Sequence, residues 1–371
     1  MAKDSAAGGI ANAKRSLGAR AAGLAASVAL VAGSVLFSLV ALELGYRLLQ
    51  SGPQALVEWP NLAHARLSTD GAGSCAYAYD ATLGWTSPAD CTSPQYNVDA
   101  AGFRITPATG ALAEPPLLVV GSSFAKGDEV ADSETWPAYL QALTGRRVVN
   151  AGVSGYALDQ SVMTAERIAP KVKPLAILVG FTPNDIRRAE LKVSWSREKP
   201  YFTATDGQLE LHNVPVPGQA NAPVALSTIA RLLGRLMVAD EIVKRLGLHK
   251  GWYYTETQGA PAGSGEAIAC LLMSRLAALG VPTVVMAQYG RGFWRADAAR
   301  QTRELRAVRK VLGCASEAGL VALDLADALK QAVEARGIDT LYRNDHHSAP
   351  GNRLMADLIV QALVERHVVI R

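Results

Sequence analysis

Four short segments of this chain carry residue types that could perform nucleophilic catalysis. The first, GSSF at 121–124, directly follows an apolar run, Leu117–Val120, that predicts a buried strand. Gly121 can adopt backbone angles that other residues resist, so the chain can turn sharply at the end of this strand. A hydroxyl at such a turn lies at the carboxyl edge of a sheet, where open α/β folds bind ligands. We therefore predict that Ser123 is a nucleophile; the alternative is a polar turn whose serines cap a helix.

Two further segments follow later predicted strands. Residues 150–156 read NAGVSGY, and Gly155 lets backbone N–H groups approach a ligand. Residues 180–185 read GFTPND and present Asn184 just after a strand. Glycine-rich turns after strands are usually only turns, so each segment is weak evidence by itself.

The fourth segment, NDHHSAPG at 344–351, precedes the last predicted helix and supplies Asp345, His346 and His347. An imidazole and a carboxylate are the groups that activate a serine hydroxyl. A metal site is the alternative for these three residues. Adjacent residues rarely share one metal, however, and the chain has no HExxH spacing. We therefore expect no metal and no cofactor.

The order and spacing of these segments resemble the conserved blocks of the SGNH (GDSL-like) hydrolase superfamily, whose blocks give Ser, Gly, Asn and His in that order. The resemblance covers about residues 83–366 apart from an insert. NVDAAGFR at 97–104 is similar to a segment found upstream of the serine in membrane-anchored bacterial members. The resemblance implies that Ser123 is the nucleophile. It also implies an oxyanion hole made by the Ser123 and Gly155 N–H groups and the Asn184 side chain.

Two positions depart from the family pattern. Ser122 stands where the family usually has Asp, at a position that is not the catalytic acid. The family's acid usually lies two or three residues before the His, and Asp345 fits that spacing for His347. The distance to the start of the last helix favours His346 instead. Both histidines therefore stay open as the base, with Asp345 implied as the carboxylate that orients the ring.

Strands and helices alternate around these segments, which predicts an α/β fold with a mainly parallel sheet and helices on both faces. The resemblance implies a three-layer α/β/α, flavodoxin-like sheet. Expected strands are Leu117–Val120, Arg147–Val153, Leu175–Phe181, Pro282–Gln288 and Leu320–Leu325. Expected helices are Thr135–Leu143, Leu158–Ile168, Glu266–Leu279, Ala298–Ala318 and Pro350–Val364.

An insert at residues 190–265 interrupts this alternation. Asp206-Gly207 between alternating runs predicts a hairpin, and Ala225–Leu246 predicts an amphipathic helix. The insert could serve as a lid or substrate-recognition element over one end of the sheet, or as a structural decoration. Its aromatic residues could form a sugar platform or simply the core of the insert: Trp195, Tyr201, Phe202, Trp252 and Tyr253.

The N-terminus predicts a membrane anchor. Residues 21–42 carry no charge and, at ~1.5 Å per residue, span about 30 Å as a helix. Basic residues precede them, which predicts a cytoplasmic N-terminus in the bacterial inner membrane and a periplasmic remainder. A cleaved signal peptide is the alternative, although residues 42–47 form a poor cleavage site. We expect a disordered cytoplasmic tail at 1–20, a transmembrane anchor at 21–42, a linker and arm at 43–110, and a hydrolase-like domain at 111–371.

Charge and cysteine content indicate which binding partners and which cellular compartment to expect. The formal net charge is +4 and the basic residues are scattered, so nucleic acid is not an expected partner. An oxidising compartment would allow a Cys75–Cys91 disulfide, and Cys270 and Cys314 could form a second bridge or stay as thiols. We expect a serine esterase or acyl-transfer enzyme. Its substrate would be an ester-linked acyl group, such as O-acetyl, on an extracytoplasmic carbohydrate or a small ester. The alternative is a non-catalytic, anchored carbohydrate-binding or scaffold protein of an envelope polysaccharide system.

Overall fold

The computed structural model describes residues 4–60, 62, 75, 77–108, 110–218, 228–246, 248, 252 and 256–366. The chain forms two compact units. The first contains Met1–Ala65 and Leu226–Trp252, and the second contains Arg66–Ala225 and Tyr253–Arg371.

The second unit is built on a five-stranded sheet in the order β14-β13-β7-β5-β6. All neighbouring pairs of these strands are parallel. Numbered along the chain, the strand order is 2-1-3-4-5, so the flavodoxin-like prediction is confirmed. The strands are β5 (Ala113–Gly121), β6 (Arg146–Asn150), β7 (Ala176–Phe181), β13 (Thr283–Ala287) and β14 (Val321–Leu323).

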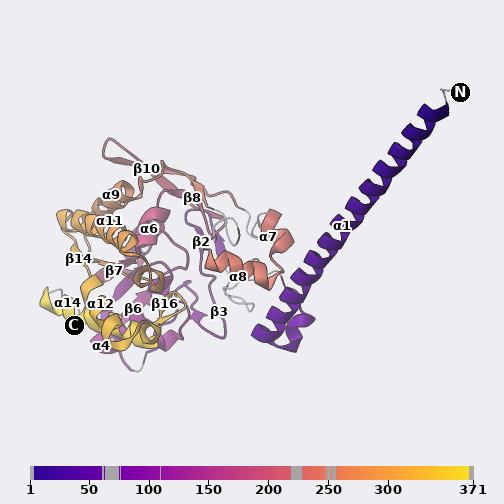
Figure 1. Ribbon diagram of the computed structural model, residues 1–371. Helices are drawn as coiled ribbons and strands as arrows, with labels where there is room; N and C mark the ends of the chain where they lie inside the picture. The colour runs from indigo at the N-terminus through magenta and orange to yellow at the C-terminus, as the bar shows by residue number, and fades with distance from the viewer. Residues whose placement is uncertain are drawn as a thin grey trace. The chain divides into compact units, whose positions relative to one another are not determined.

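Helices cover both faces of this sheet (Figure 1). On one face α4 (Trp136–Thr144) packs against α14 (Ala349–Glu365). On the other face α9 (Gly265–Ala277) packs against α5 (Leu158–Val172) and α11 (Ala298–Glu317). The sequence pattern predicted these five helices but not α12 (Ala326–Arg336). The three-layer α/β/α architecture is therefore confirmed.

Short elements form the rim of the second unit. The N-terminal arm contains β1 (Ala78–Asp80), β2 (Gly84–Thr86), β3 (Cys91–Thr92) and β4 (Asn97–Val98). The insert contains β8 (Leu191–Ser194), β9 (Arg197–Glu198), β10 (Tyr201–Thr205), β11 (Gln208–His212) and β12 (Thr257–Gln258). The hairpin predicted at Asp206-Gly207 joins β10 to β11, and both turn residues have positive φ, 50° and 75°.

Two disulfides cross-link the second unit. Cys75 is bonded to Cys91, as predicted for an oxidising compartment. Cys270 is bonded to Cys314, which joins α9 to α11. Cys270 and Cys314 therefore form a disulfide and are not free thiols.

The first unit is organised on α1 (Asp4–Ser51), a single helix (Figure 1). The prediction of disorder over residues 1–20 is wrong for residues 4–20, which form the first part of this helix. Within α1, Ala26–Ser51 is long and apolar enough to cross a membrane. A short helix, η1 (Pro53–Leu56), follows it.

The other part of the first unit comes from the insert. In place of one helix over Ala225–Leu246, the structure has α7 (Thr228–Leu233) and α8 (Met237–Arg245), while residues 225–227 lie outside the described part of the chain. Gly234 follows the end of α7, and glycine is a poor residue for continuing a helix. Residues 226–252 belong to the same compact unit as α1.

Candidate active site

The turn after β5 contains Gly121, Ser122 and Ser123, and its backbone leaves no room for a side chain at position 121. Gly121 has φ +154°, and a Cβ atom on it would lie 2.4 Å from the Gly180 carbonyl oxygen. The helix α3 (Ser123–Lys126) begins immediately after this turn. Ser122 is buried and its Oγ donates to Asp185 Oδ2 at 2.9 Å. The Ser122 side chain therefore ties the turn to the segment after β7, and the neighbouring Ser123 stays partly exposed.

His346 is the histidine that meets Ser123. Its Nε2 lies 2.8 Å from Ser123 Oγ. His346 and His347 form β16 (His346–His347), which pairs with β15 (Tyr342–Arg343). Consecutive residues of a strand point to opposite sides, so only one of the two rings can reach the serine. His347 is 2% exposed and its ring packs against Phe124 and Tyr342, with centroids 5.2 and 5.1 Å away.

The carboxylate beside His346 is Glu129, a residue that the sequence reading did not select. Glu129 Oε1 lies 3.2 Å from His346 Nδ1, and the two side chains are 25% and 21% exposed. Asp345 faces elsewhere, because it sits in the turn between β15 and β16 and its Oδ1 accepts a hydrogen bond from the Gly292 N–H at 2.8 Å. The geometry therefore corrects the implied Asp345: Glu129 occupies the position of an orienting carboxylate.

Glu129 is held on a loop with an unusual backbone. Its φ is +72°, in the left-handed region that non-glycine residues seldom adopt. The buried guanidinium of Arg104 holds the loop: Nε donates to Asp132 Oδ1 at 2.9 Å, Nη1 to the Lys126 carbonyl at 3.1 Å, and Nη2 to the Val130 carbonyl at 2.7 Å. Arg104 ends the segment NVDAAGFR, so this upstream motif has a structural purpose. It fixes the loop that carries Glu129.

The charges around the two histidines push their pKa values in opposite directions. Burial lowers the pKa of His346, but the close Glu129 carboxylate and the negative charges of Asp128 and Asp345 outweigh it, so the pKa is raised above 6.5. Burial, and then the charge on His346, lowers the pKa of His347 to about 3. The surroundings of His346 therefore favour its protonated form, whereas those of His347 favour the neutral ring.

Three groups that could bind an oxyanion follow the ends of β5, β6 and β7. The Ser123 N–H lies in the first turn of α3, and Gly155 has φ +79°. Asn184 is exposed, and its Oδ1 accepts from Arg187 Nε at 3.0 Å, which leaves the amide group as a donor. Arg187 is itself fixed by two hydrogen bonds to Glu256, at 2.8 and 2.9 Å. These are the donors that the sequence predicted, and each follows the carboxyl end of a core strand.

Asn352 is a second residue whose role sequence reasoning missed. It is 1% exposed, its Oδ1 accepts from the Trp136 N–H at 3.2 Å, and its Nδ2 donates to the His347 carbonyl at 3.1 Å. It therefore fixes the histidine segment against the start of α4. The GNR that follows the histidines was a usable signal, since Asn at that position is unusual for a helix interior.

The proposed sugar platform is only partly near the site. A Cβ on Gly155 would lie 3.0 Å from Trp195 Cδ1, so this indole borders Gly155, one of the candidate oxyanion donors. Phe202 is fully buried, and Tyr201 stacks on His212 with centroids 5.1 Å apart. The others belong elsewhere: Trp252 falls in the first unit and Tyr253 lies outside the described residues.

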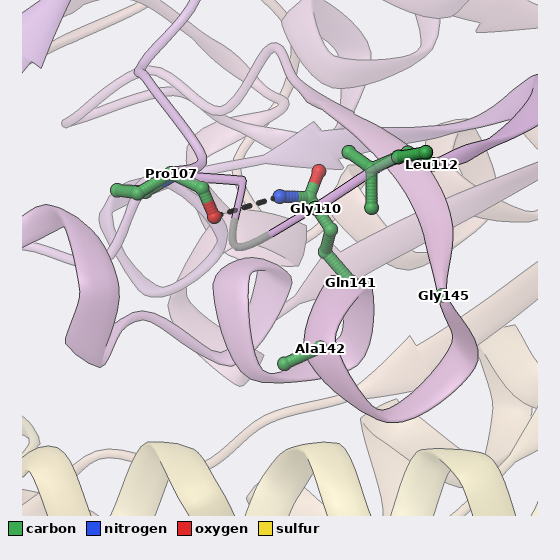
Figure 2. A pocket seen from close by; sticks show the side chains of 7 residues that line it. Pro107, Gly110, Leu112, Gln141, Ala142 and Gly145 are labelled. Atoms are coloured by element: carbon green, nitrogen blue, oxygen red, sulfur yellow. Dashed lines mark hydrogen bonds between the residues drawn. The ribbon is translucent and has the colours of Figure 1, made fainter.

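A small pocket of about 120 Å³ lies at the opposite edge of the sheet, where β5 and β6 begin (Figure 2). Within it the Gln141 side chain donates to the Pro107 carbonyl at 2.9 Å. The remaining lining residues are Gly110, Ala111, Leu112, Ala142 and Gly145. None of the lining side chains titrates or acts as a nucleophile, so this pocket is no alternative active site.

Comparison with known proteins finds similarity to solved structures only. No family model and no curated protein matches the sequence. The chain is similar to LAE5, an alpha/beta hydrolase from the metagenome of Lake Arreo, Spain, at 14% identity over 68% of this chain and 95% of the other, with a TM-score of 0.42. It is similar to a putative lipolytic protein of the G-D-S-L family from Desulfitobacterium hafniense (13% identity, 67% and 100% covered, TM-score 0.37).

An acetylxylan esterase from Geobacillus stearothermophilus is also similar, at 16% identity over 68% of this chain and 95% of the other, with a TM-score of 0.39. At these levels the alignments describe a likeness alone. The contacts around Ser123 carry the functional argument.

Proposed function

We propose that this protein is an SGNH-type serine esterase or acyl-transfer enzyme that uses Ser123, His346 and Glu129. The observation that carries the proposal is the 2.8 Å contact between Ser123 Oγ and His346 Nε2, with Glu129 Oε1 3.2 Å from the other ring nitrogen. A nucleophile, a base within hydrogen-bond reach and a third group that orients the base are the signature of an activated serine. A protein that only binds carbohydrate would have no need of this alignment.

In the first half of the reaction, His346 Nε2 takes the proton from Ser123 Oγ while the oxygen attacks the ester carbonyl. The tetrahedral oxyanion accepts hydrogen bonds from the N–H groups of Ser123 and Gly155 and from the Asn184 amide. Glu129 keeps His346 Nδ1 protonated and stabilises the imidazolium that forms. His346 then protonates the departing alkoxide, which leaves an acyl group on Ser123.

In the second half, His346 accepts a proton from an incoming hydroxyl that attacks the acyl carbonyl. The bond between the acyl carbon and Ser123 Oγ then breaks, and His346 returns the proton to Ser123 Oγ. Water as the acceptor gives a hydrolase, and a sugar hydroxyl gives a transferase. Both outcomes use the same residues, so the site geometry is compatible with either.

We propose an O-acylated carbohydrate outside the cytoplasm as the substrate, with a small ester as the simpler alternative. Two disulfides favour an oxidising compartment, and α1 can anchor the protein in the bacterial inner membrane with its N-terminus in the cytoplasm. The Trp195 indole beside Gly155 offers a flat apolar surface on which a sugar ring can pack. No metal or cofactor is required by this chemistry.

Turnover of 4-nitrophenyl acetate tests the proposal. The Ser123→Ala variant of the full-length protein should lose at least 99% of the activity, with an unchanged melting temperature. The matched control is Ser161→Ala, because the Ser161 hydroxyl donates to the Ala157 carbonyl at the start of α5, and its loss should leave turnover as in the wild type. Equal activity in the Ser123→Ala variant would overturn the assignment.

A further inference from the structure

A buried ion pair near the C-terminal end of α1 binds part of the insert. Glu43 and Arg47 are 6% and 1% exposed, and Arg47 Nε lies 2.7 Å from Glu43 Oε1. The two carboxylate oxygens of Glu43 also accept from the N–H groups of Met237 at 2.7 Å and Val238 at 2.9 Å. These N–H groups belong to the first turn of α8, where a helix has free donors and favours a negative charge.

Arg47 completes the connection on the other side. Its Nη1 donates to the carbonyls of Ala55 at 3.0 Å and Glu58 at 3.1 Å, and its guanidinium lies 3.6 Å from the centre of the Trp59 ring. Its Nη2 donates to the Arg235 carbonyl between α7 and α8. The charges near the end of α1 are thus satisfied inside the first unit, which is how a retained anchor, rather than a removed signal peptide, is expected to be built.

Several large apolar side chains of this unit are exposed. On α7, Ile229 is 62% and Leu232 72% exposed, and on α8, Ile242 is 51% and Leu246 64% exposed. Leu49 near the end of α1 is 86% exposed. Large apolar side chains exposed on two short helices are unusual for a surface that faces water, and exposed apolar patches mark interaction sites.

The charge of the segment favours a lipid surface as the occupant. Residues 226–252 contain five Lys or Arg and two Asp or Glu, so their formal net charge is +3. Basic residues next to exposed Leu and Ile are typical of helices that lie in the interface of a bilayer with anionic lipids. Leu48 and Leu49 near the end of α1 are exposed as well, and they belong to the segment of α1 that is apolar enough to cross a membrane.

We propose that α7 and α8 form a membrane seat, which lies in the interfacial layer of the bilayer that α1 crosses. Ile229, Leu232, Ile242 and Leu246 insert among the outer parts of the acyl chains, while the basic side chains meet the headgroups. The Glu43–Arg47 pair holds the seat against α1 at the membrane surface. This proposal is independent of the esterase assignment, because none of its residues belongs to the candidate active site.

Lipid quenching tests the membrane seat in the full-length protein. Leu232→Cys and Leu246→Cys are labelled with an environment-sensitive fluorophore (NBD) and reconstituted in phosphatidylcholine–phosphatidylglycerol vesicles with or without brominated acyl chains. Both disulfide pairs remain intact, and the described part of the chain has no free cysteine to compete for the label. The matched control is Leu211→Cys on β11 of the second unit, where Leu211 is 40% exposed.

We expect brominated lipid to quench the labels at 232 and 246 at least threefold more than the label at 211, with blue-shifted emission. Quenching no stronger than at 211 would overturn the proposal. A second outcome would also overturn it: labels that neither aqueous iodide nor brominated lipid quenches, and that iodide can quench once the protein is diluted in lipid. That outcome would identify a second copy of the chain as the occupant.

Discussion

The ring of His346 lies between two oxygen atoms that come from distant parts of the chain. Ser123 Oγ is 2.8 Å from Nε2, and Glu129 Oε1 is 3.2 Å from Nδ1. A carboxylate at that nitrogen fixes the tautomer that leaves Nε2 free to accept the serine proton. The separation is that of an ion pair, and such contacts often shorten when substrate binds.

Replacing Glu129 tests which carboxylate assists His346. Because Glu129 raises the pKa of His346, Glu129→Gln should lower it and move the acid limb of the kcat/KM profile to lower pH. Loss of the orienting charge should also reduce kcat/KM by about a hundredfold or more. Asp345→Asn is the matched control. It should shift the profile less and cost little activity, because Asp345 contacts the Gly292 N–H. The reverse pattern would restore Asp345 as the acid.

Trp195 provides a test of the substrate class. Trp195→Ala should raise KM for an acetylated oligosaccharide about tenfold, since the sugar ring loses the indole that borders Gly155. The kcat/KM for 4-nitrophenyl acetate should change less than threefold, and Trp195→Phe should recover most of the oligosaccharide KM. Equal losses on both substrates would contradict a role in carbohydrate recognition.

At the scale of elements, the site depends on loops that side chains lock together. Arg104 holds the Glu129 loop through the Lys126 and Val130 carbonyls and Asp132, and Asn352 holds the histidine segment. These buried donors stabilise the loops, because removing one leaves a buried acceptor without a hydrogen bond, which costs about 1–3 kcal/mol of folding free energy.

The Arg104→Lys variant tests the loop lock. An ammonium group cannot reproduce the planar fork of the guanidinium, so several buried acceptors lose their donors. We expect a loss of about 2–3 kcal/mol in the free energy of unfolding and an acid limb of kcat/KM that moves to lower pH, as in Glu129→Gln. Chemical denaturation and a pH–rate profile measure the two effects. A destabilised variant with an unmoved pH profile would show that Arg104 supports the fold but not the position of Glu129.

Hydrophobic patterns in the sequence predicted the helices and strands that are held in place by burial of apolar side chains. The strands and five main helices were predictable because β7 is fully buried and the helices alternate with such runs along the chain. The choice between His346 and His347 was not predictable, since it depends on how β16 pairs with β15. Glu129 could not be identified from the sequence, because its partner His346 is distant along the chain and nothing in the local sequence indicates the left-handed backbone that places it.

At the scale of the whole molecule, His347 couples the fold to pH. Its pKa is lowered to about 3 in the folded protein, while an unfolded chain binds the proton near 6.5. Between these values the unfolded state holds more protons, so the stability contributed by neutral His347 is complete above about pH 6.5 and is lost as the pH falls toward 3.

Comparing the wild type with His347→Leu isolates this contribution. Between pH 6.5 and 4.5 the free energy of unfolding of the wild type should fall by up to about 1.4 kcal/mol per pH unit more than that of the variant. Denaturant titrations of the detergent-solubilised protein, followed through the transition of the second unit, provide the measurement. Parallel pH dependences in the two proteins would contradict a buried neutral His347.

The account as a whole requires an unusually reactive hydroxyl at Ser123. Incubating the full-length protein with a fluorophosphonate and mapping the adduct by peptide mass spectrometry measures that reactivity directly. We predict one adduct per chain, on Ser123, that is absent in Ser123→Ala and forms at least a hundredfold more slowly in His346→Ala. Failure of the folded wild-type protein to react, or reaction at another serine with Ser123 unmodified, would contradict the central claim.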